Sequence, residues 1–109
     1  MKFYQTANGL VFGEGEGTEL VPNTTDAAGE KHVPVLEVSG RTVTVTVGAV
    51  EHPMLEKHYI TMIVLETDKG CQVKYLNPGE KPQAQFALLE GENAVAAYEY
   101  CNQHGLWKA

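Results

Sequence analysis

Histidine and cysteine side chains at short spacings give this chain the means to bind a metal ion. Only two residues separate Cys101 from His104, so a thiolate and an imidazole can reach the same ion. His52 and His58 bracket a short segment that Pro53 stiffens. All four histidines of the chain, His32 included, fall in predicted loops or at predicted strand ends, where a rigid scaffold can bring side chains together. The pattern favours one shared metal site.

His32 is the remaining histidine, and it directly follows Glu30 and Lys31. Four imidazoles and a thiolate exceed the four ligands of structural zinc, and blue copper would leave two histidines without a role. Five such ligands suit a square-pyramidal iron with an axial thiolate and one open position. Taken singly, each histidine is more typical of a surface or hydrogen-bonded residue, and Glu30 and Lys31 are more typical of solvated charges.

Short apolar runs between eleven glycines and five prolines predict the strands that must position these side chains. The clearest run is 41–50, where valines and threonines alternate with the period of a strand. Residues 94–100 are ambiguous, because alanine favours a helix and tyrosine a strand. Pro34 indicates an edge strand or a bulge. Six or seven strands predict an antiparallel sandwich or a small barrel, the further strands being 32–38, 59–65, 71–76 and 84–89.

The size and charge of the chain limit the classes of protein to which it can belong. We expect 109 residues at 11.9 kDa to form one domain over 1–109, with 1–29 as an arm that carries no cysteine ligand. Eight Lys and Arg against fourteen Asp and Glu give a net charge of −6, which argues against nucleic-acid binding. The lack of a long apolar run and of a signal-like start predicts no membrane span and a cytoplasmic location with reduced thiols.

The candidate ligands lie in three separated motifs. They are Glu30-Lys31-His32-Val33-Pro34, then His52-Pro53-Met54 with His58, then Cys101-Asn102-Gln103-His104-Gly105-Leu106-Trp107-Lys108. In this order they resemble the iron-site motifs of the superoxide reductases, the family that includes desulfoferrodoxin and neelaredoxin. The resemblance runs from about Leu20 to the C-terminus.

The resemblance implies an all-β fold, an immunoglobulin-like antiparallel β-sandwich of about seven strands. It implies one iron ion (Fe2+/Fe3+) per chain and the one-electron reduction of superoxide to hydrogen peroxide. The axial ligand would be Cys101, and the equatorial ligands would be His32, His52, His58 and His104. His104 would bind through Nδ1 and the other histidines through Nε2. Glu30 would occupy the sixth position of ferric iron, and Lys31 would attract the anionic substrate.

The partners also follow from the resemblance. Desulfoferrodoxins carry a second, four-cysteine iron centre, but no cysteine precedes Cys71 here, so the chain resembles the one-iron members. The resemblance then implies a rubredoxin-type electron donor and a homo-oligomer, either a dimer or a tetramer.

Two other classes stay open. One is a non-enzymatic zinc or iron module, which would not need Glu30 and Lys31 beside His32. The other is an immunoglobulin-like interaction domain, which leaves the spacing of Cys101 and His104 unexplained. Metal analysis separates the interaction domain from both metal-binding classes.

Five further residues are expected to have packing roles. Cys71 is expected to be packed within a strand, and Met54 to pack, either against the site or as a gap filler. Trp107 is expected to cover the Cys101 loop. Tyr98 and Tyr100 share one strand face and are expected in core or interface packing.

Overall fold

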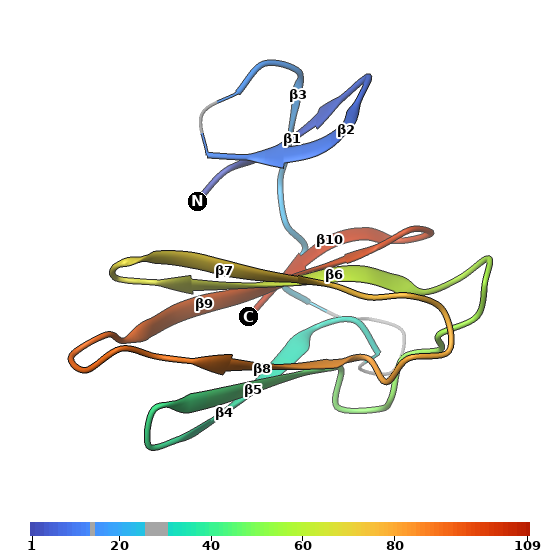
Figure 1. The fold of residues 1–109 in the computed structure, drawn as a ribbon. Helices are drawn as coiled ribbons and strands as arrows, with labels where there is room; N and C mark the ends of the chain where they lie inside the picture. Colours follow the sequence, from blue (N-terminus) through green and yellow to red (C-terminus); the bar gives the residue numbers. More distant parts are fainter. Residues whose placement is uncertain (14, 26–30) are drawn as a thin grey trace.

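A computed structural model describes residues 1–13, 15–25 and 31–109, and these contain ten strands and no helix. Seven of the strands form two antiparallel sheets that pack face to face (Figure 1). The four-stranded sheet has the order β10 (Gly105–Lys108), β9 (Ala94–Cys101), β6 (Ile60–Thr67), β7 (Gly70–Tyr75). The three-stranded sheet has the order β4 (Pro34–Ser39), β5 (Thr42–Val47), β8 (Gln83–Ala87). The predicted β-sandwich of about seven strands is confirmed.

The main core lies between these two sheets. In β5, Val43, Val45 and Val47 are fully buried, while the alternating threonines lie on the opposite face of the sheet. Their partners on the facing sheet include Ile63 and Leu65 of β6 and, from β9, Ala97 and Cys101. The Cys101 side chain is therefore held by core packing.

Two stretches differ from the sequence-based expectation. Residues 94–101, ambiguous between helix and strand, form β9 because this segment pairs with β6 on one side and β10 on the other. Tertiary pairing thus overrides the helical preference of its alanines. Strand β10 was not among the predicted strands. The 59–65 and 71–76 prediction is confirmed, since β6 and β7 form a hairpin in which Thr67 pairs with Gly70.

The positions of Pro34 and Cys71 test two smaller expectations. Pro34 is the first residue of β4, an edge strand, as predicted. The expectation that Cys71 is packed is wrong, because Cys71 is exposed. It lies on β7, an edge strand of the four-stranded sheet. An edge strand leaves one side without a neighbour, so a side chain near its turn can remain in solvent.

The N-terminal residues form more than the expected arm. Three strands make a small antiparallel sheet of order β2-β1-β3: β1 is Phe3–Thr6, β2 is Gly9–Phe12 and β3 is Thr18–Leu20. Gly17 has φ +118°, and a Cβ there would collide with the backbone oxygen of Gln5. The glycines thus permit tight turns between strands rather than preventing order.

This N-terminal sheet covers the outer face of the four-stranded sheet, so the molecule has three layers (Figure 1). Phe3 is fully buried, and its ring lies 4.9 Å from the ring of Tyr98. Phe3 belongs to a second hydrophobic cluster, the N-terminal cluster, which lies between the N-terminal sheet and the four-stranded sheet. Tyr98 and Tyr100 both pack in this cluster, as expected. Burial raises the pKa of Tyr98 to about 12, and its hydroxyl donates a hydrogen bond to Glu66 at 2.8 Å.

Among the described residues, no helix is long and apolar enough to cross a membrane.

Candidate metal centre

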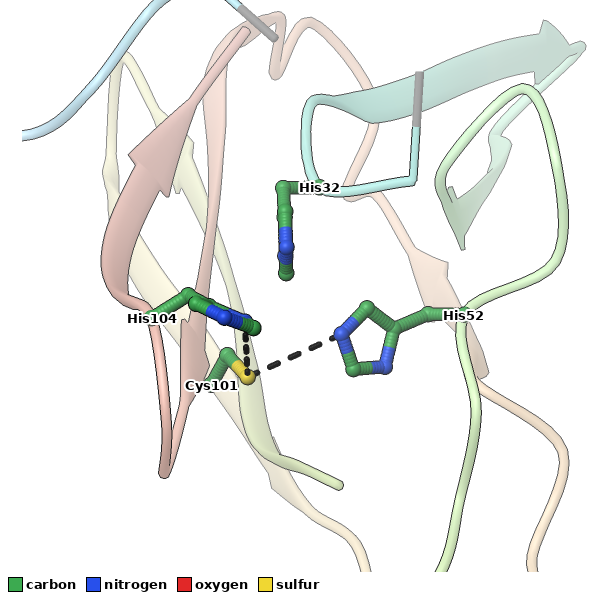
Figure 2. A group of neighbouring side chains, drawn as sticks. All are labelled: His32, His52, Cys101 and His104. Carbon is green, nitrogen blue, oxygen red and sulfur yellow. Dashed lines mark hydrogen bonds between the residues drawn. The ribbon is translucent and has the colours of Figure 1, made fainter. Parts of the chain in front are cut away.

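Three separate parts of the chain meet at one end of the sandwich. His32 lies in a bend just before β4, and His52 and His58 lie in the connection between β5 and β6. Cys101 is the last residue of β9, and His104 lies in the turn that leads into β10. His32, His52, Cys101 and His104 point toward one another (Figure 2).

The donor atoms of these four residues lie close enough together for a single ion. All of them are within 4.8 Å of one another. The Cys101 Sγ atom lies 3.6 Å from His52 Nε2 and 3.8 Å from His104 Nδ1 (Figure 2). The nitrogen of each histidine that faces the sulfur is the one that the family resemblance implies.

The four imidazoles form a closed ring. Their centroids are 4.7 Å apart for His32 and His52, 4.8 Å for His52 and His58, 5.0 Å for His58 and His104, and 4.7 Å for His104 and His32. His58 thus belongs to the ring of imidazoles, although it is outside the four-residue group whose donor atoms lie within 4.8 Å. The Nε2 atom of His58 is buried, and no hydrogen-bond partner for it occurs among the described residues. That nitrogen is free to bind an ion.

The environment of His52 favours its neutral form. Its pKa is lowered to about 4, chiefly by burial and to a smaller extent by the charges of the other three histidines, while a hydrogen bond to Pro53 acts in the opposite direction. His52 Nδ1 lies 2.7 Å from the Pro53 carbonyl oxygen, so the tautomer that donates this hydrogen bond leaves the Nε2 lone pair facing Cys101. A neutral imidazole with a free Nε2 is the form that binds metals.

The environment of Cys101 favours its neutral thiol. It is fully buried, and this burial raises the pKa of its thiol, while backbone hydrogen bonds from Gln103 and His104 lower it. The nearby charge of Glu99 raises the pKa further. Glu99 is itself fully buried, two residues before Cys101 on the same strand, and sequence reasoning missed it. A metal ion would offset these effects by binding the sulfur as a thiolate.

Side chains within the Cys-x-x-His segment tie the two main ligand loops together. The Asn102 carboxamide accepts a hydrogen bond from the Tyr59 N–H at 3.0 Å and donates one to the Lys57 carbonyl at 3.1 Å. Gln103 donates to the same carbonyl at 2.6 Å. These bonds hold the loop of His58 against the loop of Cys101. Sequence reasoning assigned no role to Asn102 or Gln103, and only their place inside the motif could have drawn attention to them.

Trp107 and Met54 flank the site. The Trp107 ring stacks on His32. Trp107 Nε1 donates a hydrogen bond to the His104 carbonyl at 3.1 Å, so Trp107 contacts the loop that it was expected to cover. Met54 packs against the main core, as expected, and its sulfur accepts a hydrogen bond from the Ile60 N–H at 3.4 Å.

Of the two charged residues that precede His32, Lys31 is among the described residues. Lys31 is exposed and adjoins the buried His32. Glu30 lies outside the described residues.

The donor set suits a transition-metal ion. Imidazole nitrogen and a thiolate sulfur are ligands for iron, zinc and copper, whereas magnesium and calcium prefer oxygen. The described cluster within 4.8 Å contains no carboxylate. Fold and site together define a class: a β-sandwich with a nitrogen-and-sulfur metal centre at one end.

Comparisons with known proteins agree with this class. The family model for desulfoferrodoxin matches residues 24–109, and the chain belongs to that family. The chain is 55% identical over 87 residues to the desulfoferrodoxin of Desulfarculus baarsii. The matched region covers 80% of this chain and 68% of that protein.

Solved structures give the same result. The superoxide reductase of Treponema pallidum matches with a TM-score of 0.85 and 37% identity, over 100% of this chain and 99% of that one. The one-iron superoxide reductase of Giardia intestinalis matches with a TM-score of 0.62 and 39% identity, over 73% of this chain and 95% of that one.

Proposed function

We propose that this chain is a superoxide reductase, which converts superoxide to hydrogen peroxide by adding one electron and two protons. The observation that carries the proposal is the closed ring of four imidazoles with the buried sulfur of Cys101 beside it. Membership of the desulfoferrodoxin family supports the same conclusion.

The ligands of this proposal are one thiolate, from Cys101, and four imidazoles, from His32, His52, His58 and His104. One iron ion held there would supply the electron and stabilise the negative charge that develops on the substrate. Glu30 is proposed as the residue that takes the sixth position in the oxidised protein.

The chain itself supplies geometry and a graded environment. Pro53 orients His52 through its carbonyl oxygen, and core packing fixes Cys101 at the end of β9. His104 is exposed, whereas His52 and Cys101 are buried. In this proposal, substrate and protons approach from the solvent on the His104 side, while the sulfur stays in a medium of low dielectric constant.

Lys31 is proposed to attract superoxide. The chain carries a net charge of −6, so its average field repels an anion. An exposed cation next to His32 gives a local attraction over a short range, within roughly the 8 Å screening length of physiological salt.

The electrons are proposed to come from a separate, rubredoxin-type protein. Cys71 and Cys101 are the chain's two cysteines, too few for a four-cysteine iron centre of its own. A homo-oligomer, dimer or tetramer, and a cytoplasmic location complete the proposal.

Iron loading followed by rapid mixing with superoxide tests the function. We expect one iron per chain, a visible thiolate-to-iron band on oxidation, and one peroxide formed per superoxide consumed when a reductant supplies electrons. Oxygen formed together with peroxide would indicate dismutation instead. Iron binding without superoxide consumption would favour a non-enzymatic metal module.

A further inference from the structure

Trp107 touches two candidate ligands, and the proposed function gives it no task. It is the single tryptophan of the chain. Its ring lies flat on the imidazole of His32, with centroids 4.7 Å apart and an angle of 14° between the planes. Its indole N–H donates to the backbone carbonyl of His104 at 3.1 Å. One side chain thus connects ligands from two distant parts of the chain.

The backbone of Trp107 is anchored on both sides. In β10, Trp107 pairs with Glu99 of β9. On the other side it forms a parallel bridge with Asn23, whose N–H donates to the Leu106 carbonyl and whose carbonyl accepts from the Lys108 N–H, both at 2.9 Å. A side chain on a strand paired on both sides is a rigid support for a site.

His32 is placed differently in the chain from Trp107. It lies in a bend that precedes β4, outside any strand. Its ring is steeply inclined to its two histidine neighbours, by 57° to His52 and 66° to His104. The Trp107 ring, in contrast, lies nearly parallel to the His32 ring and covers one of its faces. A stacked contact of this kind restrains the plane of the ring that it covers.

We propose that Trp107 is a positioning residue of the metal centre. Its ring sets the plane of the His32 imidazole, and its N–H fixes the turn that presents His104. This inference rests on the metal-binding part of the proposed function, in which both histidines are ligands. Partners that orient metal ligands typically change metal affinity about 10- to 100-fold when removed, and we expect a loss of that size without the ring.

Cobalt(II) titration of the metal-free protein tests the proposal without any turnover. Trp107→Leu removes both contacts, and Trp107→Phe retains a ring but loses the N–H donor. Tyr100→Leu is the matched control, because Tyr100 is a half-buried aromatic residue of β9 whose side chain packs in the cluster under the N-terminal sheet, whereas the side chain of Cys101 lies in the main core. We expect weaker cobalt binding by about 10- to 100-fold in Trp107→Leu, a smaller loss in Trp107→Phe, and wild-type affinity in the control.

Two spectroscopic measurements separate positioning from general stability. In wild-type protein, one equivalent of cobalt should quench the fluorescence of Trp107, since the stacked imidazole would become a ligand. In iron-loaded protein, the oxidised thiolate band should shift in Trp107→Leu and remain unchanged in Tyr100→Leu.

The outcomes are distinct. Wild-type cobalt affinity and an unshifted band in both Trp107 variants would overturn the proposal. If Trp107→Leu does not fold, the reduced affinity of Trp107→Phe and the fluorescence quenching decide it. Cobalt binding without superoxide reduction would contradict the proposed activity. The cobalt affinities of the Trp107 variants would still decide whether Trp107 positions the site. A wild-type protein that binds no cobalt would overturn both proposals.

Discussion

The two sides of the candidate metal centre are built differently. On one side, Cys101 and His104 lie at the junction of β9 and β10, and β9 is a central strand whose end belongs to the main core. On the other side, His32 lies in a bend before an edge strand. The first side takes its precision from the sheet. On the second side, the ring of Trp107 stacks on the His32 imidazole.

The His52 and His58 loop is intermediate between these two. Its backbone makes a small internal bridge between Leu55 and His58, and the Asn102 side chain fastens it to the Cys101 turn. Ligand geometry therefore depends on contacts between segments wherever no sheet supplies it.

The largest expected effect is at the rigid side. Cys101→Ser keeps a donor atom of similar size but replaces a thiolate by a poorly ionised hydroxyl. We expect complete loss of the visible thiolate-to-iron band in the oxidised protein, measured after iron loading. A variant that kept the band would remove Cys101 from the ligand set and end the contrast between the two sides.

A smaller effect is expected from the fastening of the intermediate loop. Asn102→Ala removes two hydrogen bonds to the 57–59 backbone and leaves the Gln103 bond in place. We expect cobalt affinity to fall by about tenfold, at the low end for a residue that orients ligands. Asn77→Ala, at an exposed position in another loop, is the control. Equal affinities for the two variants would show that the sheet alone positions the site.

A kinetic effect alone is expected at the His32 side. Lys31→Ala should slow the encounter with superoxide by no more than about tenfold and weaken its dependence on ionic strength, because one local charge is removed. Lys69→Ala makes the same change in net charge at the β6–β7 turn, the opposite end of β6 from the site. Stopped-flow rates at several salt concentrations compare the two. Identical behaviour would leave Lys31 as an ordinary surface residue.

The smallest effect is expected far from the metal centre. Hydrogen bonds from the Asn93 backbone and side chain lower the pKa of Asp68 below its usual value. The folded state therefore favours the carboxylate, and this contribution to stability is present above the unfolded pKa near 3.8 and is lost as pH falls through the lower folded pKa. The urea midpoints of wild type and Asp68→Asn should differ at pH 5 and converge toward pH 2. A difference independent of pH would contradict this, and cobalt affinity at neutral pH should not change.

Much of the fold could be read from local patterns. The valine and threonine alternation of 42–47 has only one periodic interpretation, and the turn at Asp68-Lys69 sits between two β-prone runs. Residues 94–101 could not be assigned in this way, because their strand form depends on neighbours on both sides. The N-terminal sheet was missed for a related reason: Phe3 and Leu20 gain their burial only against a face supplied by β6 and β9.

By itself, the sequence determined the set of possible ligands and the chemistry they allow. Residue types do not depend on the fold, and the spacing of Cys101 and His104 is short enough for both to reach one ion whatever surrounds them. Only the tertiary structure decided which atoms meet. His32, His52 and Cys101 are remote in sequence, so their approach, the tautomer imposed by Pro53 and the stack of Trp107 arise from the packing of separate segments. Short-range spacing is a property of the chain, whereas long-range convergence is a property of the folded sheets.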